Sequence, residues 1–185
     1  MKIEKEVKEK MERKEEVKAR PTIGLFAGIF NEEGKLLVKR RPQGISLAGE
    51  WDLPGGAVEE EANAKALDER VIGRELAREV KEEVGIEISI SPMLPMFPAV
   101  LKGGTDWAFV IVVGRTDKKP SRGEIKWVSP DELKELAERP PGNRLVSGWG
   151  KRMCRLALMA LCHSTNKDYR KKAIQYLQEI QASWE

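Results

Sequence analysis

The chain has 185 residues and a formal net charge of +3; 41% of its residues are hydrophobic and 34% are charged. This length suits one globular domain with additional elements, and the hydrophobic share argues against a disordered or collagen-like chain. Two cysteines are too few for a disulfide-stapled secreted domain. No stretch offers the roughly 18 consecutive apolar residues that a membrane-spanning helix needs. The near balance of 33 basic and 30 acidic residues argues against nucleic acid or a membrane as the main partner.

The first twenty residues form a densely charged segment. Pairs such as Glu4 with Lys8 and Glu6 with Lys10 lie four residues apart, a spacing that supports a solvated helix over residues 1–20. The segment lacks the apolar core of a secretory signal, and it is too rich in acidic residues for a transit peptide. We therefore expect a cytoplasmic protein.

The next part of the chain indicates a hairpin followed by a long helix. Apolar runs at 22–30 and 35–38 flank a four-residue turn that ends in Gly34, which predicts two paired strands. After a loop rich in glycine and proline, a stripe of apolar residues at helical spacing predicts a helix over residues 63–84. Gly85 follows at a typical helix end. The stripe comprises Ile72, Leu76, Val80 and Val84.

Strands are expected next at 86–90, 107–113 and 124–128. Ser129, Pro130 and Glu132 then form a helix-start signature with a capping serine and a glutamate three residues later. This signature predicts a helix that extends to about Ala137.

Two adjacent prolines and a glycine at 140–142 predict a boundary. We expect a core domain over residues 21–140 and a helical extension over 141–185. The extension is expected to hold two helices joined around residues 164–166. The apolar run 156–162 fits either a buried helix or a subunit interface, and an interface there would make the protein a homodimer.

The long helix carries a cluster of acidic residues. At about 100° per residue, Glu79, Glu82 and Glu83 fall on one flank beside the apolar stripe, and Glu75 extends that flank. On an exposed helix, like charges at this spacing cost only about 0.2 to 0.5 kcal/mol per pair. In a partly buried cleft the repulsion approaches about 3 kcal/mol, which a cation or a proton would relieve. Glutamate oxygens with no histidine nearby favour Mg²⁺ or Mn²⁺ over zinc.

A glycine pair precedes this helix. Gly55 and Gly56 permit close backbone approach, so a carbonyl from this turn can face a metal ion held by the helix carboxylates.

Together these residues resemble a known motif. Gly56, followed by the run from Arg78 to Ile86 (REVKEEVGI), is similar to the Nudix box, G-x5-E-x7-R-E-U-x-E-E-x-G-U, in which U is aliphatic. The second half matches at every defined position. The resemblance implies an α/β fold, the Nudix-type α/β/α sandwich with a mixed sheet, here with a charged N-terminal helix and two C-terminal helices added.

The first half of the motif departs from the pattern. The pattern places 13 residues between its glycine and its arginine, whereas 21 lie between Gly56 and Arg78, an insertion of eight. Counting forward reaches Ala62 at the glutamate position, and counting back reaches Arg70. Glu61 takes the place of the missing glutamate if the extra residues follow it, and Glu69 takes it if they precede it.

The resemblance implies a metal-dependent pyrophosphohydrolase. Such an enzyme cleaves the phosphoanhydride bond of a nucleoside diphosphate linked to another moiety, by in-line attack of water on phosphorus. By the resemblance, Gly56, Glu79, Glu82 and Glu83 would hold Mg²⁺ or Mn²⁺. Arg78 would orient a neighbouring carboxylate, and the general base would be one of these glutamates, Glu124 or Asp106. The substrate would be a small nucleotide, and the sequence leaves open nucleoside triphosphates, nucleotide sugars and capped ends.

Two alternatives remain open at this stage. The insertion would, in one interpretation, have disabled catalysis and left a nucleotide-binding or scaffolding module, although the intact acidic half favours an enzyme. Lys39, Arg40 and Arg41 either reach substrate phosphates or form a solvated strand end.

Cys154 and Cys162 are expected to pack as small apolar groups.

Overall fold

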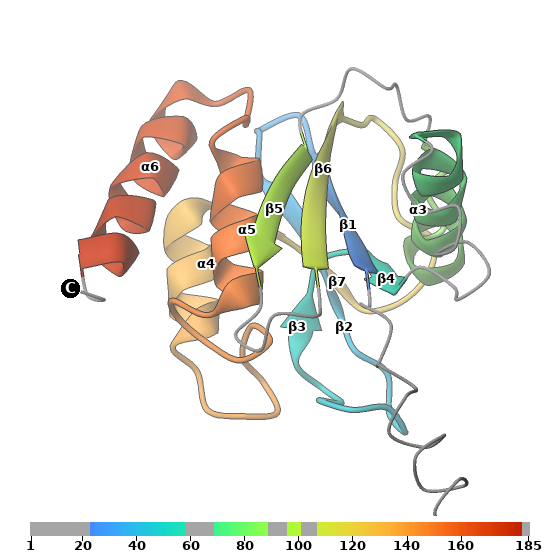
Figure 1. Cartoon of the computed structure of the whole chain (residues 1–185), viewed down its shortest axis with the longest axis horizontal. Helices are drawn as coiled ribbons and strands as arrows, with labels where there is room; N and C mark the ends of the chain where they lie inside the picture. Colours follow the sequence, from blue (N-terminus) through green and yellow to red (C-terminus); the bar gives the residue numbers. More distant parts are fainter. Residues whose placement is uncertain (1–22, 58–68, 89–95, 101–106, 183–185) are drawn as a thin grey trace, which may run out of the picture.

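A mixed β-sheet forms the centre of the computed structural model, which describes residues 23–57, 69–88, 96–100 and 107–182 (Figure 1). The strand order is β3-β2-β1-β6-β5, with β4 also paired to β1 and β7 to β2. β1 and β6 run parallel, and the other pairings are antiparallel. The strands are β1 (Ile23–Phe30), β2 (Leu36–Arg40), β3 (Trp51–Asp52), β4 (Gly55–Ala57), β5 (Met96–Val100), β6 (Trp107–Arg115) and β7 (Ile125–Val128).

Helices cover both faces of this sheet. Helix α3 lies on one face, and α4, α5 and α6 lie on the other (Figure 1). Alternate residues of β1 enter the two layers: Ile29 packs towards α3 and Phe30 towards α5, as a two-residue period requires. The helices are α3 (Glu69–Val84), α4 (Pro130–Ala137), α5 (Arg152–Leu161) and α6 (Lys167–Ala182). The expected α/β/α sandwich with a mixed sheet is therefore confirmed.

The apolar stripe of α3 is buried as the sequence predicts. Leu76, Val80 and Val84 have no exposed surface and pack with Leu25 and Ile29 of β1. The described part of α3 begins at Glu69, so the expected helix start at residue 63 lies outside the described residues. The predicted helix over residues 1–20 lies outside them too.

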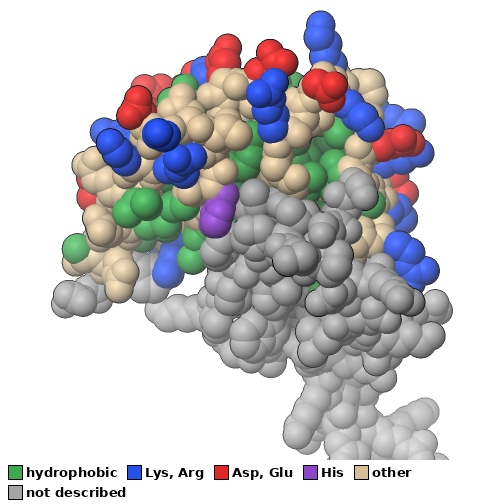
Figure 2. All heavy atoms as spheres, turned by 90° about the horizontal axis from the view of Figure 1, so that it is seen from above, with side chains coloured by type: hydrophobic (Ala, Val, Ile, Leu, Met, Phe, Trp, Pro, Cys, Tyr) green, Lys and Arg blue, Asp and Glu red, His purple; other side chains and the backbone are tan. Residues whose placement is uncertain are grey.

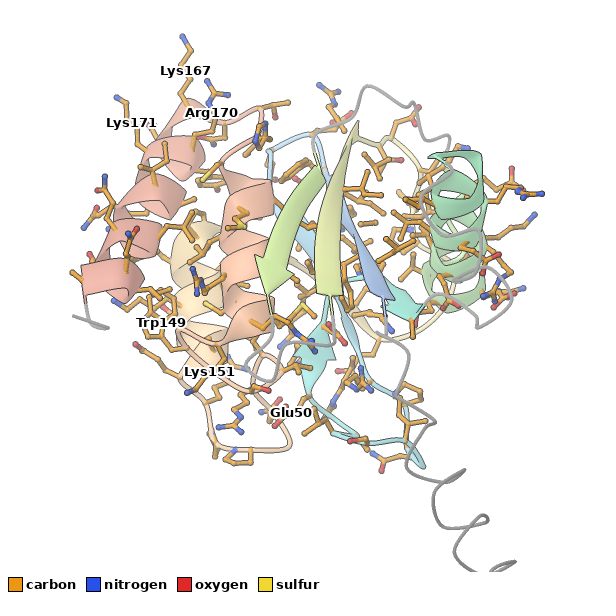
Figure 3. The ribbon with its side chains drawn as sticks, viewed as in Figure 1. Glu50, Trp149, Lys151, Lys167, Arg170 and Lys171 are labelled. Atoms are coloured by element: carbon orange, nitrogen blue, oxygen red, sulfur yellow. The ribbon has the colours of Figure 1, made fainter. Side chains whose placement is uncertain are left out.

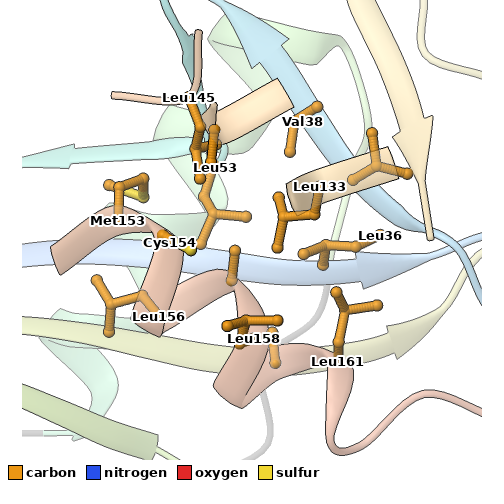
Figure 4. Packing of buried hydrophobic residues seen from close by; sticks show 14 of the residues in the cluster. Leu36, Val38, Leu53, Leu133, Leu145, Met153, Cys154, Leu156, Leu158 and Leu161 are labelled. Carbon is orange, nitrogen blue, oxygen red and sulfur yellow. The ribbon is translucent and has the colours of Figure 1, made fainter. Parts of the chain in front are cut away.

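Helix α5 belongs to the main hydrophobic core. Leu156, Leu158 and Leu161 are fully buried in the same cluster as Leu36 and Val38 of β2 (Figure 4). The apolar run is therefore a buried helix within one chain. Burial raises the pKa of the neighbouring Cys154 thiol to about 12, which agrees with its expected packing role. The division of the chain at residue 140 and the homodimer stay predictions.

The segment after the double proline is fastened to the sheet. The Trp51 amide donates to the Arg144 carbonyl and the Val146 amide to the Trp51 carbonyl, both at 2.8 Å. The buried Glu50 carboxylate, near β3 in Figure 3, accepts from Arg144 Nε at 3.1 Å and from the Ser147 amide at 3.2 Å. Residues 142–147 thus stay hydrogen-bonded to β3 and to Glu50 after the double proline.

The remaining elements agree only partly with the sequence. Helix α4 has the predicted capping box between Ser129 and Glu132. The described part of the expected strand 86–90, residues 86–88, is a loop whose Ile86 is buried beneath α3. Strands β3, β4 and β5 were not predicted because the first two have two or three residues and β5 contains Pro98.

Among the helices formed by the described residues, none has the length and apolar character to cross a membrane.

Candidate active site

The glycine turn and the acidic helix meet at Gly56 and Glu79. A Cβ atom added to Gly56 would lie 3.0 Å from Glu79 Oε2 and 3.2 Å from its Cδ. Gly55, the preceding residue, has φ +136°, and a Cβ there would lie 2.0 Å from the Leu25 carbonyl oxygen of β1. The fold thus requires Gly55 for close strand pairing, whereas Gly56 makes room for a carboxylate.

Arg78 gathers three glutamates of α3. Its guanidinium donates to Glu79 Oε1 at 2.7 Å, Glu82 Oε2 at 2.9 Å and Glu75 Oε2 at 3.1 Å. The predicted acidic flank therefore exists, and Arg78 neutralises part of its charge. Glu79 and Glu75 are mostly buried, whereas the Glu82 side chain is 56% exposed.

Glu83 turns towards the sheet and is held from two strands. Its Oε1 accepts a hydrogen bond from Lys39 Nζ of β2, and its Oε2 accepts from the Gly55 amide of β4 at 2.8 Å. The Glu83 side chain is 23% exposed and that of Lys39 is 7% exposed. Of the four residues selected from the motif on α3, Glu79 and Glu83 therefore lie against the glycine turn, and Arg78 links Glu79 to the more exposed Glu82.

Burial raises the pKa of both inner carboxyl groups. For Glu79, loss of solvent raises the pKa, Arg78 opposes the rise, and repulsion from Glu83 and Glu82 adds to it. For Glu83, loss of solvent again dominates, Lys39 opposes it and Asp52 adds to it. These carboxylates repel one another in a partly dehydrated setting, a situation that additional positive charge would stabilise.

The donor set suits a hard divalent cation such as Mg²⁺ or Mn²⁺. Carboxylate and backbone oxygens are the ligands that these ions take. Because Gly56 has no side chain, the Glu79 carboxylate lies close to the backbone of the glycine turn. Within the described ranges, no three acidic, histidine or cysteine side chains already surround one point. The glutamates instead face Arg78 and Lys39, and each paired oxygen retains a second lone pair.

Lys39 is the site residue whose role the sequence left open. Residues two apart on a strand share a face, so Lys39 follows Leu37 towards α3. Arg41 bonds Asp52 Oδ2 at 2.7 Å, and Arg40 bonds Glu124 Oε2 at 3.0 Å. The interpretation as a solvated strand end is therefore wrong for Lys39, because this residue is buried. In the sequence, the position of Lys39 two residues after the apolar Leu37 was the feature that could have indicated a side chain turned towards α3.

Other candidates from the sequence are not brought to the site or cannot be placed. The Glu124 side chain is 57% exposed and pairs with Arg40. Glu61 and Asp106 lie outside the described residues, as does the side chain of Glu69. The missing first glutamate of the motif thus stays unassigned.

Basic side chains at the start of α6 form a separate group. Lys167, Arg170 and Lys171 lie across the sheet from α3 (Figure 3). On the face in Figure 2, lysine and arginine side chains lie among aspartate and glutamate side chains. Within the part of the chain that the structure describes, the acidic cluster is instead paired with Arg78 and Lys39.

Comparison with known proteins adds independent observations. The sequence profile of the family described as "NUDIX domain" matches residues 18–149. A MutT-like protein from Streptomyces ambofaciens is 30% identical over 123 residues, which covers 62% of this chain and 68% of that protein. A CTP pyrophosphohydrolase from Escherichia coli strain K12 is 34% identical over 68 residues, which covers 37% of this chain and 44% of the relative.

Among solved structures, the solution structure of the E. coli ORF135 protein is similar in fold. The TM-score is 0.51 at 24% sequence identity, and the match covers 80% of this chain and 96% of that one.

Proposed function

The chain belongs to the NUDIX family of hydrolases, and on that premise we propose that it hydrolyses the phosphoanhydride bond of a nucleoside diphosphate linked to another moiety. Water attacks phosphorus in line with the bond that breaks, and the two phosphate products separate. The observation that carries the proposal is the packing of Glu79 and Glu83 against the Gly55–Gly56 turn, beside Arg78.

In this proposal the Gly56 carbonyl, Glu79, Glu82 and Glu83 hold Mg²⁺ or Mn²⁺. When bound, the ion neutralises charge on the substrate phosphates and lowers the pKa of a coordinated water. Gly55 supports the arrangement through its amide, which fixes one oxygen of Glu83.

Arg78 orients the carboxylates of α3. Its bonds to Glu79 and Glu82 hold two side chains that would otherwise separate by repulsion. We assign the proton acceptor for the attacking water to a glutamate of α3 in preference to Glu124, because Glu124 is exposed and paired with Arg40. Asp106 stays a candidate from the sequence.

The substrate is proposed to be a small nucleotide. A relative named CTP pyrophosphohydrolase makes nucleoside triphosphates the first compounds to test. The near balance of 33 basic and 30 acidic residues supports a small molecule over nucleic acid, which binds to extended basic surfaces.

A panel of nucleotides tests the proposal. Nucleoside triphosphates, nucleotide sugars and dinucleoside polyphosphates are incubated with the protein and Mg²⁺ or with EDTA, and the nucleotide products of each reaction are separated and measured by chromatography. We expect turnover of at least one class with Mg²⁺ and none with EDTA. Glu79→Gln should lose the activity, and Glu135→Gln, an exposed residue of α4, should keep it. Nucleotide binding by the wild type without any turnover would instead support the binding module.

A further inference from the structure

Lys39 is a buried lysine at the edge of the acidic cluster. It is 6% exposed, and its ammonium group faces inward to α3. A lysine at a strand end usually extends its charge into water, because its long side chain allows this at little cost. The inward position of Lys39 therefore calls for partners that keep its charge buried.

The first partner is Glu83. Lys39 Nζ and the Gly55 amide donate to different oxygens of this carboxylate, from β2 and β4 respectively. Two donors on separate strands fix both the position and the plane of the carboxylate. Because each oxygen has two lone pairs, one on each remains available to another cation.

The second partner is Asp52. Lys39 and Asp52 are paired across β2 and β3, and Asp52 is only 2% exposed. Asp52 is itself fixed by Arg41 NH1 at 2.7 Å and by the Leu53 amide at 2.9 Å. The positive charge of Lys39 acts on both Asp52 and Glu83. Lys39 is thus held in place by its buried acidic partners Asp52 and Glu83, unlike the flexible lysine of a surface ion pair.

We propose that Lys39 is a positioning residue for Glu83: it orients the carboxylate so that the free lone pairs of both oxygens can take a divalent cation. This inference rests on the proposed function, because it assigns a role to Lys39 at the same site. Lys39 acts through Glu83 and does not itself contact substrate, since its ammonium is turned into the protein.

Mn²⁺ binding without substrate tests this role. The free Mn²⁺ signal is followed by electron paramagnetic resonance during titration of the wild type and of Lys39→Met, which keeps the side-chain length and removes the charge. Loss of a group that orients a metal ligand typically weakens metal binding by about 10- to 100-fold, and we expect a change of that size. Lys35→Met is the matched control, because Lys35 pairs with Glu132 near the other end of β2, and it should bind like the wild type.

A double-mutant cycle separates positioning from a general effect of charge. In the Glu83→Gln background, Lys39→Met should cause no further loss of Mn²⁺ affinity, because its target is already gone. A further loss of the same size as in the wild type would overturn the proposal. So would Lys39→Met affinity within about twofold of the wild type, since second-sphere effects are larger than that.

The controls distinguish this inference from the function beneath it. Failure of the wild type to bind Mn²⁺ would overturn both, whereas binding by the wild type and unchanged binding by Lys39→Met would overturn the inference alone. Thermal unfolding in EDTA shows whether each variant is folded. Lys39→Gln, which retains a donor, replaces Lys39→Met if that variant does not fold. Failure of both to fold would assign Lys39 to the fold and overturn the positioning role.

Discussion

Gly56 lies so close to Glu79 that any side chain at this glycine would touch the carboxylate, with 3.0 Å between a Cβ and Oε2. Gly56→Ala should therefore displace Glu79 and lower hydrolytic activity by about 10- to 100-fold, as small misplacements at reacting centres do. Its folding stability should change by less than about 1 kcal/mol, because alanine is tolerated in an ordinary strand conformation. Initial rates and thermal unfolding of the same preparation measure both effects.

The neighbouring glycine provides the contrast. Gly55→Ala would place a Cβ 2.0 Å from the Leu25 carbonyl oxygen at a φ of +136°, so it should lower the free energy of unfolding by about 3 kcal/mol or more. An alanine at Gly56 that unfolds the protein as strongly as one at Gly55 would show that the Glu79 contact is not its main constraint.

Helix α5 should be essential to folding. Leu156 is fully buried in the cluster that includes Leu36 of β2, so Leu156→Ala should lower the free energy of unfolding by about 2 to 5 kcal/mol. Removal of residues 141–185 should leave a chain without a cooperative transition. Chemical denaturation followed by tryptophan fluorescence measures both. Cooperative unfolding of the fragment 1–140 would instead support an independent domain that ends at residue 140.

The start of α4 depends on a reciprocal cap. The Glu132 amide donates to Ser129 Oγ, and the Ser129 amide donates to Glu132 Oε2. Ser129→Ala should cost about 1 kcal/mol of unfolding free energy, a typical value for a lost helix cap. Urea denaturation measures this cost.

The same cap should make stability sensitive to acid. Burial raises the pKa of Glu132, but the hydrogen bonds from Ser129 and Lys35 outweigh burial, so the pKa is lower in the folded protein. Its stabilising contribution should be complete above about pH 4.5, the ordinary value, and should disappear as the pH falls through the folded pKa. Glu132→Gln should flatten this part of the stability profile; an identical profile in wild type and variant would contradict the assignment.

The two cysteines should differ from free thiols in reactivity. Burial raises the pKa of Cys154 to about 12 and also raises that of Cys162. Because the thiolate is the reactive form, native protein at pH 8 should react with Ellman's reagent far more slowly than glutathione does. Both thiols should react at once in guanidinium chloride. Rapid reaction of both thiols with Ellman's reagent in the native protein would contradict this prediction, because it would show that Cys154 and Cys162 are accessible to solvent.

The sequence predicted the geometry of helix α3, because local periodicity was sufficient for it. Leu76, Val80 and Val84 repeat along one helix flank, so their burial and the adjacent position of Glu79 and Glu83 followed from helix geometry. The capping box at Ser129 was equally local. These features depend on residues close together in the chain.

The features that the sequence left open depend on distant contacts. Lys39 and Glu83 are 44 residues apart, and the sheet pairing that makes them meet cannot be found from either segment alone. Strand β3 has only two residues and is defined by its pairing with β2. Residues 142–147 follow two prolines but hydrogen-bond to Glu50 and Trp51, contacts that the local break in the helix pattern does not reveal.

The rate of Mg²⁺-dependent hydrolysis by Glu83→Gln tests the central claim most directly. Glutamine keeps the size of the side chain and removes the charge that the proposed metal site requires. With the best substrate from the nucleotide panel, we expect a folded variant whose kcat falls by about 100-fold or more, the scale typical of a lost catalytic carboxylate. A kcat within about threefold of the wild-type value at saturating Mg²⁺, far below that scale, would contradict the account.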